Sequence, residues 1–176
     1  MGTTALILDT DLDTDCDDVG AFAVARALQQ RGHVRLEALI CSAPVPSCAP
    51  CARLLADAVG LSSLPIGAYR IGTAARSPRF DEYDKHRRLA EGIYQAAGGL
   101  YNEILTREPA ADTQWEAHDA VRLYRQVLAQ AEANSVIICA IGTLSALEAL
   151  LASPADDVSQ LTGTELVRNH VRGLVT

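Results

Sequence analysis

The stretch Ala5-Leu-Ile-Leu-Asp-Thr-Asp-Leu-Asp-Thr-Asp-Cys-Asp-Asp18 joins a short apolar run to six carboxylates within ten residues. Residues Ala5–Leu8 have the composition and length of a buried strand. Val19–Gln30 follows with apolar residues at helical spacing, and Gly32 is a stop signal. The sequence therefore predicts a strand, an acidic loop and a helix in succession.

The same alternation of strands and helices continues along the chain. Further strands are predicted over Val34–Cys41, Pro65–Ala68, Ser135–Ala140 and Val171–Thr176, and further helices over Cys48–Val59, Ala117–Ala131, Leu144–Leu151 and Thr162–Asn169. This order predicts an α/β fold, with a Rossmann-like, mostly parallel β-sheet flanked by helices and joined by right-handed crossovers. Ligands of such folds gather at the carboxyl ends of the strands, which is where the acidic loop lies.

One segment departs from this regular pattern. Between Arg70 and Gln114 the sequence is rich in Arg, Asp, Glu and Gly, and only Arg87–Leu105 has helical spacing. We therefore expect an inserted lid or surface excursion there, and not an element of the sheet.

Length and composition exclude several classes of protein. The 176 residues suffice for one domain, and 49% hydrophobic residues are too many for a disordered chain. The formal net charge is 15 − 22 = −7 and Lys85 is the one lysine, which disfavours nucleic acid as a partner. Apolar runs of membrane-spanning length are absent, and the first residues lack a basic leader, so neither a membrane span nor a signal peptide is expected. With an odd number of cysteines, five, a cytoplasmic location is the expectation.

The acidic loop itself predicts a metal site. Six neighbouring carboxylates repel one another, and they stay ionised together when a cation offsets their charge. Oxygen ligands of this kind favour Ca²⁺ or Mg²⁺ over zinc. The alternative is a solvated acidic turn in which Asp17 and Asp18 interact favourably with the start of the following helix. The loop lacks the glycine and closing glutamate of an EF-hand, and no phosphate-binding glycine-lysine motif is present.

Three stretches together resemble a known family. They are Ile7-Leu-Asp-Thr-Asp11 followed by Asp15-x-Asp-Asp18 and the helix start Ala21–Ala25, then Val136-Ile-Ile-Cys-Ala-Ile-Gly-Thr-Leu-Ser-Ala-Leu147, and Glu165-Leu-Val-Arg-x-x-Val-Arg-x-Leu-Val175. In this order and spacing they resemble the inosine-uridine-preferring nucleoside hydrolases, and the resemblance covers nearly the whole chain.

The resemblance implies hydrolysis of the N-glycosidic bond of a nucleoside to ribose and free base, with Ca²⁺ as cofactor and Mg²⁺ as the less favoured ion. It implies that Asp11 is both a metal ligand and the general base, and that Asp18 and the carbonyl of Ile141 are further metal ligands. Asp17 would contact the ribose hydroxyls. Asp9 and Asp15 would support these groups without touching the metal.

The chain also departs from the family's pattern. Asp13 replaces a glycine of the longer-loop members, and Ser42 follows the second strand where the family has a ribose-binding asparagine. Family members are substantially longer, and their C-terminal part supplies an Asp, a His and an Asn to the site. Residues 1–176 are accordingly expected to form a single nucleoside hydrolase-like domain that is incomplete at its C-terminus.

Two other interpretations stay open. A haloacid-dehalogenase-like phosphatase would use Asp9 as nucleophile and Asp11 as acid. A catalytically impaired relative would instead bind a metal or a partner, and an unfinished sheet edge would then make a homo-oligomer possible.

Overall fold

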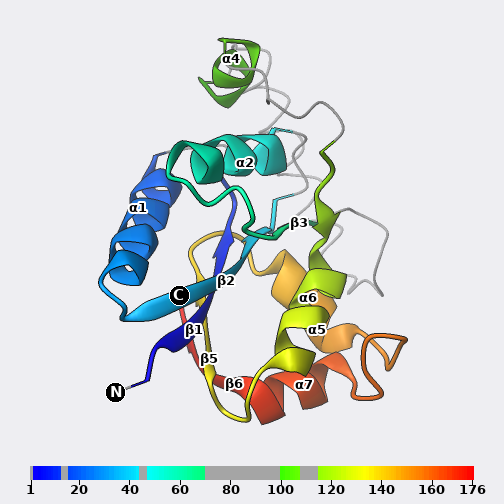
Figure 1. Ribbon diagram of the computed structural model, residues 1–176. Coiled ribbons are helices and arrows are strands. Elements are labelled where there is room, and N and C mark those ends of the chain that lie inside the picture. The colour runs from blue at the N-terminus through cyan, green and yellow to red at the C-terminus, as the bar shows by residue number, and fades with distance from the viewer. Residues whose placement is uncertain (1, 13–15, 44–46, 70–99, 108–114) are drawn as a thin grey trace.

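The computed structural model describes residues 2–12, 16–43, 47–69, 100–107 and 115–176. Within these residues the protein forms one sheet of six parallel strands, in the order β4-β3-β2-β1-β5-β6 (Figure 1). The strands are β1 (Thr4–Thr10), β2 (Val34–Cys41), β3 (Ile66–Ala68), β4 (His118–Asp119), β5 (Val136–Ala140) and β6 (Val171–Val175). The predicted mostly parallel α/β sheet is confirmed.

Helices cover both faces of this sheet. One face carries α1 (Asp17–Gln30) and α2 (Cys48–Ala58), and the other carries α5 (Ala120–Gln130), α6 (Ser145–Ala152) and α7 (Gly163–His170). Helix α4 (Leu100–Arg107) lies next to α2. Parallel sheets need this cover because both of their faces are apolar.

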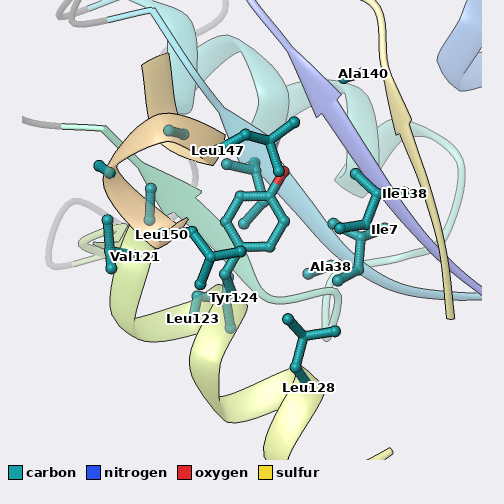
Figure 2. Packing of buried hydrophobic residues seen from close by; sticks show 14 of the residues in the cluster. Ile7, Ala38, Val121, Leu123, Tyr124, Leu128, Ile138, Ala140, Leu147 and Leu150 are labelled. Atoms are coloured by element: carbon teal, nitrogen blue, oxygen red, sulfur yellow. The ribbon is translucent and has the colours of Figure 1, made fainter. Parts of the chain in front are cut away.

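The side chains of β1 alternate between the two faces. Ala5 and Ile7 pack in the cluster with α5, α6 and α7, whereas Leu6 and Leu8 pack with α1 and α2. Figure 2 shows the first of these clusters, with the ring of Tyr124 at its centre. The same two-residue period sends the side chains at the end of β1 in opposite directions.

The order of the strands creates a switch point between β1 and β5. From β1 the chain moves outward through β2, β3 and β4, and it then returns to the opposite side of β1 to form β5 and β6. Crossovers therefore leave β1 and β5 in opposite directions, and a crevice at the carboxyl ends of such strands is where open α/β sheets bind ligands.

Two sequence predictions need correction or limitation. The helix predicted from Ala117 begins only at Ala120, because His118–Asp119 pair with β3 as the short strand β4. Asp119 then caps α5 by accepting a hydrogen bond from the backbone N–H of Arg122 at 2.9 Å. Of the predicted excursion between Arg70 and Gln114, only α4 is among the described residues.

Among the residues with described structure, none of the helices is long and apolar enough to cross a bilayer.

Candidate functional site

Three loops meet at the carboxyl end of the sheet, after β1, β2 and β5. The backbone N–H and the hydroxyl of Ser42 both donate to the carbonyl of Thr10, at 2.8 and 3.1 Å. The hydroxyl of Thr143 donates to the carbonyl of Ser42 at 3.2 Å, and the backbone N–H of Ile141 donates to the carbonyl of Asp9 at 2.9 Å. These bonds hold the loops in a fixed arrangement around the switch point.

The close approach of Asp11 to Gly142 brings two predicted ligands together. A Cβ atom built on Gly142 would lie 2.4 Å from the backbone N of Asp11 and 2.8 Å from its Cγ. Only glycine fits at this contact, because real Cβ atoms do not approach other heavy atoms so closely. The carboxyl group of Asp11 therefore lies directly beside the turn that carries the carbonyl of Ile141.

Thr10 and the start of α1 position Asp18. The side chain of Thr10 lies on the face covered by α1, and its hydroxyl donates to Oδ1 of Asp18. Asp18 is buried although it is the second residue of α1, and Asp17 beside it is exposed. Carboxylates at a helix N-terminus are stabilised by its positive end. Asp17 is exposed and therefore accessible to a ligand, whereas Asp18 is buried and bound by the hydroxyl of Thr10.

Asp9 is fully buried on the opposite face. Its Oδ2 accepts a hydrogen bond of 2.5 Å from the hydroxyl of Tyr124 on α5. Burial raises the pKa of Asp9 to about 7; the hydrogen bond from Tyr124 opposes that rise, and the charges of Asp11 and Asp18 add to it. Three carboxyl groups thus interact electrostatically at the end of β1.

The sequence pattern alone did not indicate that Tyr124 belongs to the site. Its place on the apolar face of a predicted helix marks it as a core residue, and it is indeed buried in the core. Burial raises the pKa of Tyr124 well above its ordinary value, so its hydroxyl keeps its proton and acts as a donor. The available signal was its phenol group, because a buried tyrosine hydroxyl usually finds a partner.

The donor set at the switch point fits a hard cation. Asp11 offers a carboxylate beside the Ile141–Gly142 turn, Asp18 offers a buried carboxylate bound by Thr10, and Oδ1 of buried Asp9 has no hydrogen-bond partner among the described residues. Ca²⁺ takes about six to eight oxygen ligands. Within the described part of the chain, no group of three or more Asp, Glu, His or Cys side chains could hold a metal. Two carboxylates and a carbonyl are therefore a partial ligand set.

The structure describes Ser42 but neither Asp13 nor Asp15. Asp13 and Asp15 lie outside the described residues, so the predicted supporting role of Asp15 stays a prediction. Ser42 is fully buried and directs its hydroxyl to the carbonyl of Thr10. Ser42 is therefore part of the framework between the loops.

The fold and these loops define an α/β protein with a polar, acidic site at the topological switch point of a parallel sheet. Neither a family model nor a curated protein matches the chain. Solved structures do match. A plant nucleoside hydrolase, the PpNRh1 enzyme, matches with a TM-score of 0.59 and 17% identity over 97% of this chain and 46% of its own length. The fold is nucleoside hydrolase-like.

Two effector proteins match over similar lengths. The type III effector protein XopQ, in a structure complexed with adenosine diphosphate ribose, has a TM-score of 0.65 and 18% identity over 99% of this chain and 42% of its own. The effector protein XOO4466 has a TM-score of 0.65 and 19% identity, with 99% and 43% covered. The chain thus spans less than half of the length of these three solved proteins.

Proposed function

We propose that this chain carries a nucleoside hydrolase site, in which the N-glycosidic bond of a nucleoside is hydrolysed to ribose and free base with the help of Ca²⁺. The observation that supports the proposal is the close contact of Asp11 with Gly142, the residue after Ile141, at the switch point of the sheet. The similarity of fold to a plant nucleoside hydrolase supports the same reaction.

In this proposal, Asp11, Asp18 and the carbonyl of Ile141 would hold Ca²⁺. The bound ion would offset the charge of the carboxylates and lower the pKa of a water molecule. The carboxylate of Asp11 accepts a proton from the attacking water as general base. Asp17, exposed at the start of α1, binds ribose hydroxyls through its carboxylate oxygens. Negative charge at this edge also stabilises the positive charge that develops on the ribose ring in the transition state.

The proposed substrate class is a nucleoside, purine or pyrimidine. One matched effector was solved with adenosine diphosphate ribose, a ligand that also contains a ribosyl group. A site with an acidic edge is suited to ribose, whose hydroxyl groups donate hydrogen bonds to carboxylates. The proposal assigns no residue to the base of the nucleoside. Free ribose and the free base are the two products.

A second candidate is favoured by one observation. Among the described residues, the ligand set for Ca²⁺ is partial. A site of this kind would bind a metal or a ribosyl ligand but would hydrolyse a nucleoside slowly, because misplacement of substrate alone costs about 10²-fold in rate. A phosphatase that uses Asp9 as nucleophile is not favoured, because Asp9 is fully buried and bound to Tyr124.

The test is the release of ribose from a panel of purine and pyrimidine nucleosides, with Ca²⁺ and with a chelator. We expect Ca²⁺-dependent release that the substitution Asp11→Asn abolishes, since the amide cannot accept the proton. Asp57→Asn on the exposed end of α2 serves as the matched control and should leave release unchanged. Binding of adenosine diphosphate ribose without any release from nucleosides would support the second candidate.

A further inference from the structure

We infer that Tyr124 is a positioning residue of the site, which acts through Asp9 to hold Asp11 and the carbonyl of Ile141 in place for a metal. This inference rests on the proposed function, because it names a residue that supports the same site. Among the described residues, the hydroxyl of Tyr124 donates to Oδ2 of Asp9, so its effect on the metal ligands would pass through Asp9.

The first part of the argument is the rigidity of Tyr124. It lies on α5 and is fully buried, 115 residues after Asp9 in the sequence. Its ring is surrounded by side chains from α6 and the sheet, among them Leu147, Leu150 and Ile138 (Figure 2). A ring packed in this way cannot follow a moving partner, so the hydroxyl is a fixed donor at the end of β1.

The second part is the position of Asp9 in the framework. Its carbonyl accepts the backbone N–H of Ile141, and thereby joins β1 to β5 at the switch point. The next residue, Thr10, holds Asp18, and the one after it is Asp11. A change in the conformation of Asp9 would consequently displace all three proposed metal ligands.

The third part is the cost of the arrangement. Oδ1 of Asp9 is buried without a partner among the described residues, and Asp11 and Asp18 lie near enough to repel the carboxylate of Asp9. Among the described residues, the hydroxyl of Tyr124 offsets part of this cost by donating to Oδ2 of Asp9. A core that needed only apolar packing would be served by phenylalanine at position 124, so the phenol group is explained by its bond to Asp9.

The experiment measures metal binding to the chain without nucleoside. Tyr124→Phe retains the ring and removes the hydroxyl, and we expect the Kd for Ca²⁺ from calorimetry to rise about 10- to 100-fold, as is typical when a residue behind the ligands is lost. Leu128→Ala lies in the same helix and the same cluster but does not contact Asp9 in the described hydrogen bonds. It should lower stability at least as much and leave the Kd for Ca²⁺ unchanged.

A double variant tests the route through Asp9. If Tyr124 acts through Asp9, the combination of Tyr124→Phe with Asp9→Asn should raise the Kd for Ca²⁺ no further than the larger of the two single effects. Multiplied effects would overturn the proposed route, and an unchanged Kd in folded Tyr124→Phe would overturn the inference. The inference would also be overturned if the unsubstituted chain did not bind Ca²⁺.

The experiments distinguish failure of the proposed hydrolysis from failure of the positioning role of Tyr124. If the unsubstituted chain binds Ca²⁺ but releases no ribose from nucleosides, the proposed hydrolysis is wrong, while a weaker Kd in Tyr124→Phe still supports the positioning role. If the unsubstituted chain releases ribose and Tyr124→Phe binds Ca²⁺ with the same Kd, the hydrolysis stands and the positioning role is wrong.

Discussion

Neighbouring residues at the end of β1 have different surroundings because side chains of a strand alternate between its faces. Asp9 faces α5 and is bound by Tyr124, whereas Thr10 faces α1 and binds Asp18. Asp11 follows the strand and lies beside Gly142. Among the described residues, the carboxylates of this run thus differ in burial: Asp9 and Asp18 are buried, and Asp17 is exposed.

Gly142 gives the sharpest prediction at the scale of a single residue. In Gly142→Ala, the new Cβ would meet Asp11 at distances of 2.4 to 2.8 Å, so the backbone of one loop must move. We expect the rate of ribose release to fall about 10²-fold, because small displacements of reacting groups have effects of this size. The measurement is kcat with saturating Ca²⁺.

Gly20→Ala is the matched control for this substitution. Gly20 lies within α1, where nothing lies within 4 Å of an added Cβ. Alanine there should raise the free energy of unfolding by about 0.8–1 kcal/mol, as expected from helix propensity, and leave ribose release unchanged. Equal losses of activity in Gly142→Ala and Gly20→Ala would contradict the steric explanation.

Among the elements, α5 is anchored by a buried arginine. The guanidinium of Arg125 donates to both carboxylate oxygens of Asp156, at 2.9 and 2.7 Å, and to the hydroxyl of Ser153 at 2.9 Å. It also donates to the carbonyls of Ser159 and Leu161, each at 3.0 Å. These bonds join α5 to the segment after α6, and so they fix the helix that carries Tyr124.

Removal of this arginine should destabilise the fold. Arg125→Ala takes its donor from the carbonyl of Leu161 and its cationic partner from Asp156, and we expect a loss of about 3 kcal/mol in the free energy of unfolding, measured with urea. Arg122→Ala, one turn away, removes a similar pair with Asp157 in which both side chains are exposed. Its effect should be much smaller, because exposed pairs are screened by water.

The pair of Arg125 and Asp156 makes the stability of the fold depend on pH. Hydrogen bonds from Arg125 hold the pKa of Asp156 below its ordinary value of 3.8. A carboxyl group with a lowered pKa stabilises the fold above the unfolded value, and this contribution disappears as the pH falls through the folded value. We therefore expect the free energy of unfolding to decrease below pH 3.8 more steeply in the unsubstituted chain than in Arg125→Ala. Parallel curves for the two proteins would show that Asp156 does not contribute.

Helices and strands whose apolar residues recur with a regular period could be predicted from the sequence. Elements that form only through tertiary contacts could not. Val34–Cys41 is confirmed as predicted because its apolar residues first alternate with Arg35 and Glu37 and then run unbroken from Ala38 to Cys41. The strand β4 has two residues and is a strand only through pairing with β3, which no local pattern indicates. For the same reason the acidic loop was visible in the sequence, whereas the bond between Tyr124 and Asp9 was not.

At the scale of the whole molecule, the sheet is made of two parts that meet between β1 and β5. Asp11 and Asp18 follow β1, while Ile141 follows β5, so a cation bound by all three would connect both parts. Such a site exists only in the folded chain. If the proposed site binds Ca²⁺, that binding would be linked to folding and would increase stability according to the Ca²⁺ concentration relative to Kd.

This linkage provides a prediction that does not depend on hydrolysis. At a Ca²⁺ concentration of about 100 times Kd, the free energy of unfolding should rise by about 2.7 kcal/mol, measured with urea in the presence and absence of a chelator. Asp11→Asn and Asp18→Asn should each remove most of this increase, because each takes a negative ligand from one side of the site. Monovalent salt at equal ionic strength is the control, since it screens all carboxylates alike. If salt stabilises the chain as much as Ca²⁺ does, the acidic loop responds to charge screening only, and the two parts of the sheet are joined by β1–β5 pairing without a metal.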